Sequence, residues 1–200
     1  MQKRAIETRA KILRAATELF ARHGMNGTSV DRIAETAGVN KQRIYAYFGS
    51  KEKLFIASLT HVFKEAEPFS DAMIKKLEQE PEKLTENLLR GFKEFHRTHP
   101  HFWRLLAWAN LEDARLLENL QNVRGKENNA LRRLFDQACA DNRISGISFE
   151  NYLFTMLAVP WFLRSNGQTL QYTLGYDPRA EEFSSSLFAD LNTLFSSDKE

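Results

Sequence analysis

The residues best suited to chemistry in this sequence lie between positions 41 and 48. If this run is a helix, its 3.6-residue period turns Ile44 and Phe48 inward and leaves an outer face without any Asp or Glu. A face of cations, an amide and aromatic rings suits a groove lined by phosphate groups and base edges. The sequence therefore predicts contact with nucleic acid through this face, which consists of Lys41, Gln42, Arg43, Tyr45 and Tyr47.

Three predicted helices position this face. Apolar residues at helical spacing predict a first helix over about residues 5–23, which Gly24 ends. Hydroxyls at Thr28 and Ser29 precede a second helix of about two turns, and Asn40 caps the third. Between these two short helices stands Gly38, which tolerates the positive φ of a tight turn. The spacing predicts a helix-turn-helix motif.

The charge distribution points the same way. The whole chain has a formal net charge of only +2, but residues 1–53 contain 11 Lys and Arg against 5 Asp and Glu. A basic head on a mildly acidic body is typical of a nucleic-acid-binding module joined to another function. A basic helix that is merely solvated is the alternative that charge alone leaves open.

The run from residue 28 to residue 54 resembles the DNA-binding head of TetR-family transcriptional regulators. The similarity covers about residues 8–60. It implies an all-α homodimer whose head represses transcription and whose C-terminal domain binds a small effector. It rests on Ile33-Ala34, Ala37-Gly38-Val39, Tyr45-x-Tyr47-Phe48 and Ser50-Lys51-Glu52-x-Leu54.

The resemblance also implies particular DNA contacts. Arg43 suits guanine and Gln42 suits adenine, and hydroxyls at a helix N-terminus suit a phosphate oxygen. Packing against the first helix is the alternative role of the two tyrosines. The implied base contacts are Lys41, Gln42, Arg43, Tyr45 and the Ala46 methyl group, and the implied phosphate contacts are Thr28, Ser29, Tyr47 and Lys51.

We expect an all-α fold, because no strand pattern competes with the helical periodicity. The predicted division is a helix-turn-helix domain over residues 1–50, a connecting helix over 51–67, and a helical effector-binding and dimerisation domain over 68–200. Pro68 and Pro160 predict a helix boundary and a kink. Residues 166–177 are expected to be a turn-rich connection before a last helix that starts at Pro178.

The resemblance places an effector pocket on the middle helices. Core packing is the alternative, since an aromatic stripe at helical spacing is more often packing than pocket. The pocket favours a flat or hydrophobic organic effector, and an anionic one would require an inward Arg among Arg90, Arg97, Arg104 and Arg164. The candidate lining is Met73, Phe92, Phe95, His96, Phe102, Trp103, Trp108, Asn110, Tyr152 and Met156.

Two apolar helices near the C-terminus predict the dimer interface. Two such helices from each subunit would form an isologous four-helix contact. Burial of the same faces within one chain is the alternative. The expected contacts are Leu153, Leu157, Trp161, Phe183, Leu187, Phe188 and Leu191.

Other functions are less well supported by the sequence. His96, His99 and His101 have ligand types for zinc or copper, but Pro100 lies among them and no Cys is near, so no metal or other cofactor is expected and a metal-responsive regulator is an alternative. A small-molecule-binding helical protein whose head mediates protein contacts, and a non-specific architectural DNA binder, are further alternatives. No catalytic motif appears, so we expect no enzyme.

The compartment is predicted from cysteine usage and hydropathy. A single cysteine, Cys139, fits a reducing environment. The longest uncharged apolar stretch, Tyr152–Leu163, is 12 residues, shorter than the ~20 that span a bilayer, and no secretion signal is visible. We therefore expect a cytoplasmic protein without membrane contact.

Overall fold

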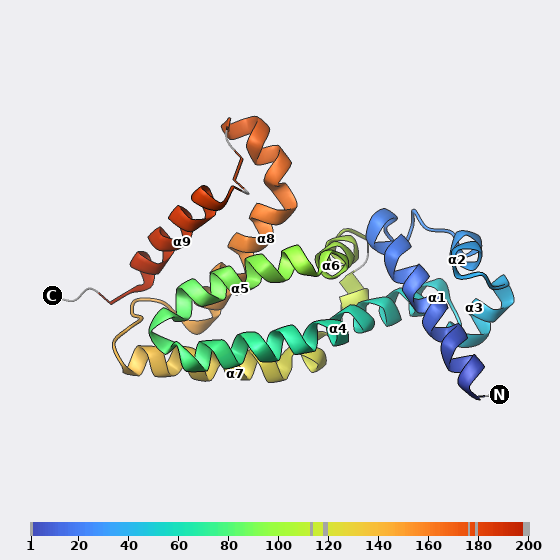
Figure 1. The fold of residues 1–200 in the computed structure, drawn as a ribbon, viewed down its shortest axis with the longest axis horizontal. Coiled ribbons are helices and arrows are strands. Elements are labelled where there is room, and N and C mark those ends of the chain that lie inside the picture. Colours follow the sequence, from blue (N-terminus) through green and yellow to red (C-terminus); the bar gives the residue numbers. More distant parts are fainter. Residues whose placement is uncertain (1, 113, 118–119, 176, 179, 198–200) are drawn as a thin grey trace. The chain divides into compact units, whose positions relative to one another are not determined.

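The structure is a computed structural model that describes residues 2–112, 114–117, 120–175, 177–178 and 180–197. These residues are helical apart from their connections and one isolated antiparallel bridge between Ile144 and Ser196, which confirms the expected all-α class. In chain order (Figure 1) the elements are α1 (Gln2–His23), α2 (Val30–Ala37), α3 (Lys41–Phe48), α4 (Lys51–Gln79), η1 (Pro81–Lys83), α5 (Leu84–Thr98), α6 (Pro100–Glu112), η2 (Ala114–Leu117), α7 (Leu120–Ala140), α8 (Phe149–Leu174) and α9 (Glu181–Phe195).

The contacts group the chain into two compact units. The first contains Met1–Glu67 and His99–Arg124, and the second contains Pro68–Thr98 and Gly125–Glu200. Helix α6 therefore belongs with the N-terminal helices, although the sequence placed it in the effector domain. The three-part division into residues 1–50, 51–67 and 68–200 stays a prediction.

The first unit is built on the apolar stripe of α1. Ile12, Ala16 and Phe20 are fully buried, and the Phe20 ring meets the Phe55 ring of α4 edge-on at 5.1 Å between centroids. Burial of such side chains contributes about 1.5–3 kcal/mol each for the larger ones. The α1 helix also packs against α2 and α6. These contacts make one core that supports the two short helices.

The turn after α1 is held by α6. The Glu112 carboxylate accepts hydrogen bonds from the backbone N–H groups of Met25 at 3.0 Å and Asn26 at 3.1 Å. Gly24 in this turn has φ +72°, and a Cβ there would lie 2.8 Å from the Trp108 ring and 2.5 Å from Glu112. Only glycine fits, because both the backbone conformation and the close approach of α6 exclude a side chain.

Capping side chains define the two short helices. Ser29 accepts a hydrogen bond from Arg32 N–H at the start of α2, and Asn40 accepts one from Arg43 N–H at the start of α3. Gly38, with φ +65°, ends α2 in the left-handed conformation that a Schellman-type turn requires. The predicted helix-turn-helix thus has the caps that its sequence specifies.

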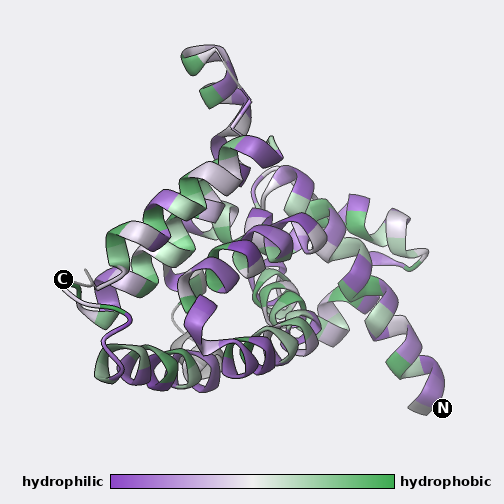
Figure 2. Ribbon diagram, turned by 60° about the vertical axis from the view of Figure 1, so that its left-hand side comes forward, coloured by the Kyte–Doolittle hydropathy of each residue, from purple (hydrophilic) through white to green (hydrophobic). Residues whose placement is uncertain are grey.

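The core of the second unit lies mainly between α5 and α8, which pack extensively against each other. Tyr152 of α8 is 1% exposed, and its hydroxyl lies 3.0 Å from the Thr85 hydroxyl of α5, so the one polar group of this buried ring has a partner. Burial raises the pKa of Tyr152 well above its usual value. Apolar and polar residues alternate along the helices of Figure 2, as amphipathic packing requires.

Two expected helix boundaries were wrong. The helix expected to end near Glu67 continues through Pro68 as α4 to Gln79, and α8 runs through Pro160 and on to Leu174 across the predicted turn-rich segment. Proline removes one backbone hydrogen bond from an existing helix, and tertiary packing outweighs that loss here. Extending a formed helix also costs far less than nucleating one, so Asn166 and Gly167 do not stop α8.

Gly24→Ala should destabilise the protein more than Gly38→Ala, by about 1–3 kcal/mol, because only the first adds overpacking to the cost of a positive φ. Both glycines have nearly the same φ and lie in the same unit, but a Cβ at Gly38 would meet nothing within 4 Å. Urea unfolding of the two variants measures the difference. Equal losses would mean that the approach of α6 does not require glycine at position 24.

Candidate nucleic-acid interface

The outer face of α3 has the composition that the sequence predicts. Ile44 and Phe48 are buried against the first unit's core, whereas Lys41, Gln42 and Arg43 are exposed. Tyr45 is 44% exposed and Ala46 is exposed, and Tyr47 is half-buried. The structure therefore brings all predicted base-contact residues together on one solvent-facing surface. Contact with bases stays a prediction.

The two cations at the start of α3 differ in their surroundings. Lys41 Nζ lies 2.9 Å from the Asp31 carboxylate of α2, and this hydrogen bond raises the pKa of Lys41. The Arg43 guanidinium forms no ion pair with any described residue, and its five donors face solvent. Arg43 is thus the cation of α3 whose planar donor group is available for a bidentate contact.

The three predicted phosphate contacts outside α3 differ in exposure. Ser29 is exposed at the N-terminus of α2, beside backbone N–H groups. Lys51 is half-buried, and its Nζ donates to the Thr28 carbonyl at 3.3 Å. Thr28 is 1% exposed, and its hydroxyl donates to the Gly24 carbonyl at 2.8 Å. We therefore remove the Thr28 side chain from the candidate phosphate contacts, because it is committed to the turn after α1.

The predicted dimer contacts are only partly at the surface. Leu157 is 38% exposed, and Leu153, Trp161, Phe183, Leu187 and Leu191 are half-buried. Phe188 is 1% exposed inside the second unit's core, so its prediction as an interface residue was wrong. The helical period cannot separate a residue that faces the chain's own core from one that faces a partner.

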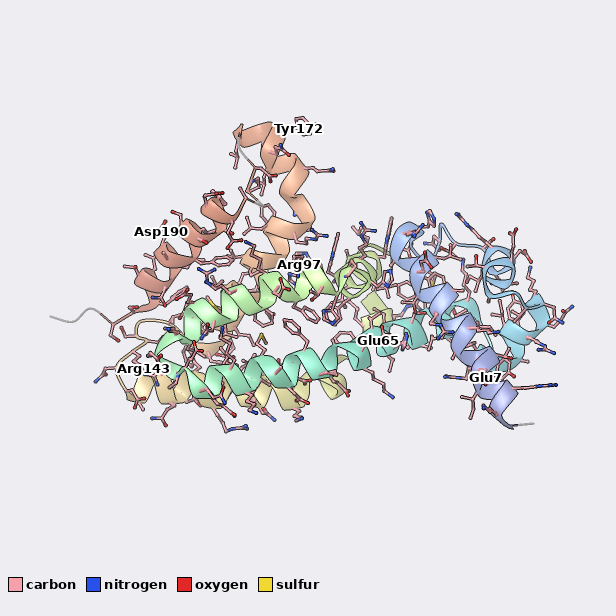
Figure 3. All side chains as sticks on the ribbon, in the orientation of Figure 1. Glu7, Glu65, Arg97, Arg143, Tyr172 and Asp190 are labelled. Carbon is pink, nitrogen blue, oxygen red and sulfur yellow. The ribbon has the colours of Figure 1, made fainter. Side chains whose placement is uncertain are left out.

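Several exposed apolar residues escaped the sequence prediction. Phe154 is 71% exposed and Phe162 is 52% exposed on α8, and Leu194 is 74% exposed on α9. Tyr172, near the end of α8, is 88% exposed and points away from the neighbouring helices in Figure 3. Helical spacing puts Phe154, Leu157 and Trp161 on one side of α8, so this helix presents an apolar face to solvent.

The predicted effector residues fall into two groups. Phe92, Phe95, His96, Tyr152 and Met156 are buried in the second unit, whereas Phe102, Trp103, Trp108 and Asn110 lie on α6 in the first. Among the described residues, Met73 lines a groove of about 340 Å³ between α4 and α5, together with Phe69 and Leu77. The predicted pocket stays untested as a binding site.

A larger cavity lies elsewhere in the second unit, and none of the residues in the predicted pocket lining borders it. It has a volume of about 430 Å³ and lies between α5, α8 and the start of α9. Arg90, Arg97 and Arg164 are in its lining, whereas Arg104 is on α6 in the first unit. The sequence contained these arginines, but it gave no signal that three of them border the same cavity.

His96 is a buried histidine beside Pro160 and Arg164, which line this cavity. It is 4% exposed, its ring meets Trp161 edge-on, and its Nδ1 has no hydrogen-bond partner. Burial lowers the pKa of His96 to about 4, opposed by a hydrogen bond to the Pro160 backbone and aided by the charge of Arg164. His96 is therefore neutral at pH 7.

The alternative metal site has no support in the described residues. No group of three or more His, Cys, Asp or Glu among them is arranged to hold a metal ion. No described helix is both long and apolar enough to cross a membrane.

Comparison with known proteins gives two family matches. The model described as "Bacterial regulatory proteins, tetR family" matches residues 12–58, and "Tetracyclin repressor-like, C-terminal domain" matches residues 81–190. The HTH-type transcriptional repressor NicS of Pseudomonas putida is 31% identical over 177 residues, which cover 86% of this chain and 83% of that protein. The repressor SCO4008 of Streptomyces coelicolor is 38% identical over 52% of this chain and 50% of its own length.

Solved structures have the same fold. The putative transcriptional regulator SCO4942 of Streptomyces coelicolor superposes with a TM-score of 0.69 at 25% identity, covering 96% of this chain and 99% of the other. A TetR family transcription regulator of Marinobacter aquaeolei has a TM-score of 0.70 at 21% identity over 99% of this chain and all of the other.

The free energy of unfolding should decrease as the pH is lowered, because His96 becomes protonated. Because the folded pKa of about 4 lies below the unfolded value of about 6.5, the unfolded chain binds more protons between these values. Neutral His96 makes its full contribution to the free energy of unfolding above about pH 6.5. As the pH falls toward 4, up to about 3 kcal/mol of this contribution is lost. Urea unfolding of His96→Leu from pH 7.5 to 5 should show a shallower decline than the parent protein. The exposed His101→Gln is the control, and an unchanged slope in His96→Leu would exclude this explanation.

Proposed function

The chain belongs to the TetR family of bacterial regulatory proteins, and from this premise we propose that it represses transcription by binding an operator as a homodimer and releasing it when a small molecule binds. Regulators of this family bind DNA operators, act as dimers and are not enzymes.

The exposed surface of α3 is the main support for DNA binding. The α3 helix is buried through Ile44 and Phe48 and exposes a surface with cations, an amide and a phenol but no carboxylate. A structural helix corner would mix charges on that surface, whereas a recognition helix must approach phosphates and base edges. Lys41, Gln42 and Arg43 are suited to base edges, and Ser29 is suited to the phosphate backbone beside them.

The apolar face of α8 supports dimerisation. Phe154 and Leu157 on this face are each at least 38% exposed, and a chain of this size rarely leaves so much apolar side chain in water without a partner. A two-fold dimer presents its two recognition helices about 34–36 Å apart, one turn of DNA, so we propose a pseudo-palindromic operator.

Release of the operator follows from linkage. An effector that binds better to a dimer whose heads do not match successive major grooves lowers DNA affinity, and operator DNA then weakens effector binding by the same factor. The sequence match across residues 81–190 supports an effector domain here.

Arg43→Ala should lose about 1–3 kcal/mol of binding per protomer on the preferred operator and accept substitutions at one base pair of each half-site. Duplexes selected from a random pool near physiological salt supply the operator, and titration of single-base variants measures the preference. Arg22→Ala, on the outer side of α1, is the control. An equal loss on a scrambled duplex would remove Arg43 from base recognition.

Lys51→Ala should instead weaken binding to every duplex and lower the salt dependence by about one unit, because a phosphate contact is independent of sequence. The variant's unfolding curve should be recorded as well, since Lys51 also donates to the Thr28 carbonyl. A loss confined to one base pair would contradict this role.

Phe154→Glu should convert the dimer to a monomer and lower operator affinity, because a carboxylate would be buried in an apolar contact. Sedimentation at several protein concentrations measures the change. Leu111, which is 78% exposed on α6, offers the control Leu111→Glu, which should remain dimeric. A Phe154→Glu protein that stays dimeric would exclude this face of α8 from the interface.

A further inference from the structure

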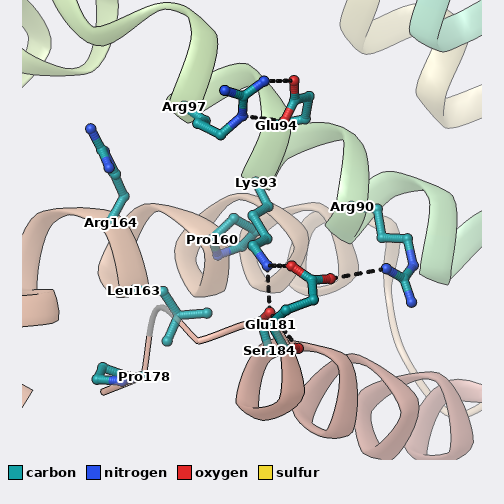
Figure 4. Close-up of a pocket in the computed structure, with 10 residues that line it drawn as sticks. All are labelled: Arg90, Lys93, Glu94, Arg97, Pro160, Leu163, Arg164, Pro178, Glu181 and Ser184. Atoms are coloured by element: carbon teal, nitrogen blue, oxygen red, sulfur yellow. Dashed lines mark hydrogen bonds and ion pairs between the residues drawn. The ribbon is translucent and has the colours of Figure 1, made fainter. Parts of the chain in front are cut away.

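The cavity between α5, α8 and the start of α9 is a candidate site for a small molecule (Figure 4). Its volume of about 430 Å³ lies within the range of small-molecule sites. All ten lining residues belong to the second compact unit.

The lining of this cavity carries an excess of positive charge. Four cations and two carboxylates face it, and three of the cations are arginines, whose planar donors match carboxylate geometry. The Arg97 guanidinium already holds Glu94 through two hydrogen bonds. The charged residues are Arg90, Lys93, Arg97, Arg164, Glu94 and Glu181.

One carboxylate of the chain already occupies part of this positive region. Glu181, the first residue of α9, lies 2.6 Å from Lys93 Nζ and 3.5 Å from Arg90. Lys93 also donates to the Ser184 hydroxyl at 2.5 Å, and its hydrogen bond to Glu181 lowers the pKa of that carboxyl. The cavity therefore has a built carboxylate position, and the chain's own side chain fills it.

The Glu181 carboxylate is the exposed partner of this contact. Its side chain is 67% exposed, whereas that of Lys93 is 30% exposed and packs over the 1% exposed Ser184. Ion pairs with such exposure contribute only about 0–1 kcal/mol, so water or another anion competes with Glu181 at little cost.

An apolar wall completes the site. Pro160 and Leu163 of α8 and Pro178, which precedes α9, also line the cavity, and all three are buried. A ligand with one anionic end and a compact apolar body would contact both surfaces. This combination of a small number of placed charges and an apolar wall is what orients small molecules in proteins.

We propose that this cavity binds an organic carboxylate, whose carboxylate group replaces that of Glu181 on Lys93 and Arg90. The regulatory consequence rests on the proposed function. Once its carboxylate is displaced, the first turn of α9 loses its ionic contact with α5, and α9 carries part of the apolar surface assigned above to the dimer. The ligand class follows from the internal occupant, because the site already fits a carboxylate.

Calorimetric titration of benzoate into the full chain without DNA tests the site, with benzamide as the neutral molecule of the same shape. Saturable binding of benzoate, at least about tenfold tighter than that of benzamide, is expected from the loss of a charged hydrogen bond. Equal binding of the two, or no binding of benzoate at millimolar concentration, would overturn the proposal.

Variants on both sides of the contact locate the binding. Lys93→Met should weaken benzoate binding at least about tenfold, and Glu181→Gln should strengthen it about two- to fivefold by removing the competing carboxylate. The controls are Glu182→Gln in the same helical turn and Lys75→Met on α4, neither of which lines the cavity. Weaker binding to Glu181→Gln would contradict the exchange, whether or not Lys93→Met folds.

Phenyl phosphate distinguishes the anion class. If it binds tighter than benzoate and responds to the same variants, the assignment to carboxylates is wrong. Operator binding is measured separately, so benzoate binding by a protein that binds no DNA would support the site and overturn the regulator. DNA binding by a protein that does not bind benzoate would support the regulator and overturn the carboxylate site.

Discussion

The whole candidate interface depends on the burial of two side chains. An α-helix of eight residues is too short to be stable alone in water, so α3 exists because Ile44 and Phe48 are buried in the first unit's core. That core in turn needs the α1 stripe around Phe20. Because these contacts fix one side of α3, the exposed positions of Gln42 and Arg43 follow from packing rather than from any contact of their own.

The sequence predicts this part of the fold well because its signals are local. Caps at Ser29 and Asn40, the turn at Gly38 and the alternation of buried and exposed positions all act within a few residues of the chain. Helix ends are harder to predict when long-range packing decides them. Pro68 and Gly167 disfavour a helix locally, yet α4 and α8 continue through them because both helices contribute to a core built from distant segments.

The ligand cavity lay beyond sequence reasoning for a related physical reason. Helical periodicity places Phe92 and Tyr152 on the inward side of their helices, and both are buried. A buried aromatic ring fills space in the core, so its burial does not predict a cavity. The cavity instead forms where charged residues of α5 meet α8 and α9, and Lys93 and Glu181 are 88 residues apart. Their contact depends on tertiary structure that no local pattern encodes.

A ligand-responsive regulator needs two states whose free energies are close, since a ligand shifts the equilibrium only by its differential affinity for them. A deeply buried ion pair would be unsuitable as the displaced contact, because removing one partner leaves a charge unpaired at a cost of about 3–5 kcal/mol. The Lys93–Glu181 contact avoids this cost in two ways. Glu181 is mostly exposed and is solvated once released, and the incoming carboxylate pairs with Lys93 again. The exchange thus conserves charge in the cavity, so the ligand's apolar body decides which side of the equilibrium is favoured.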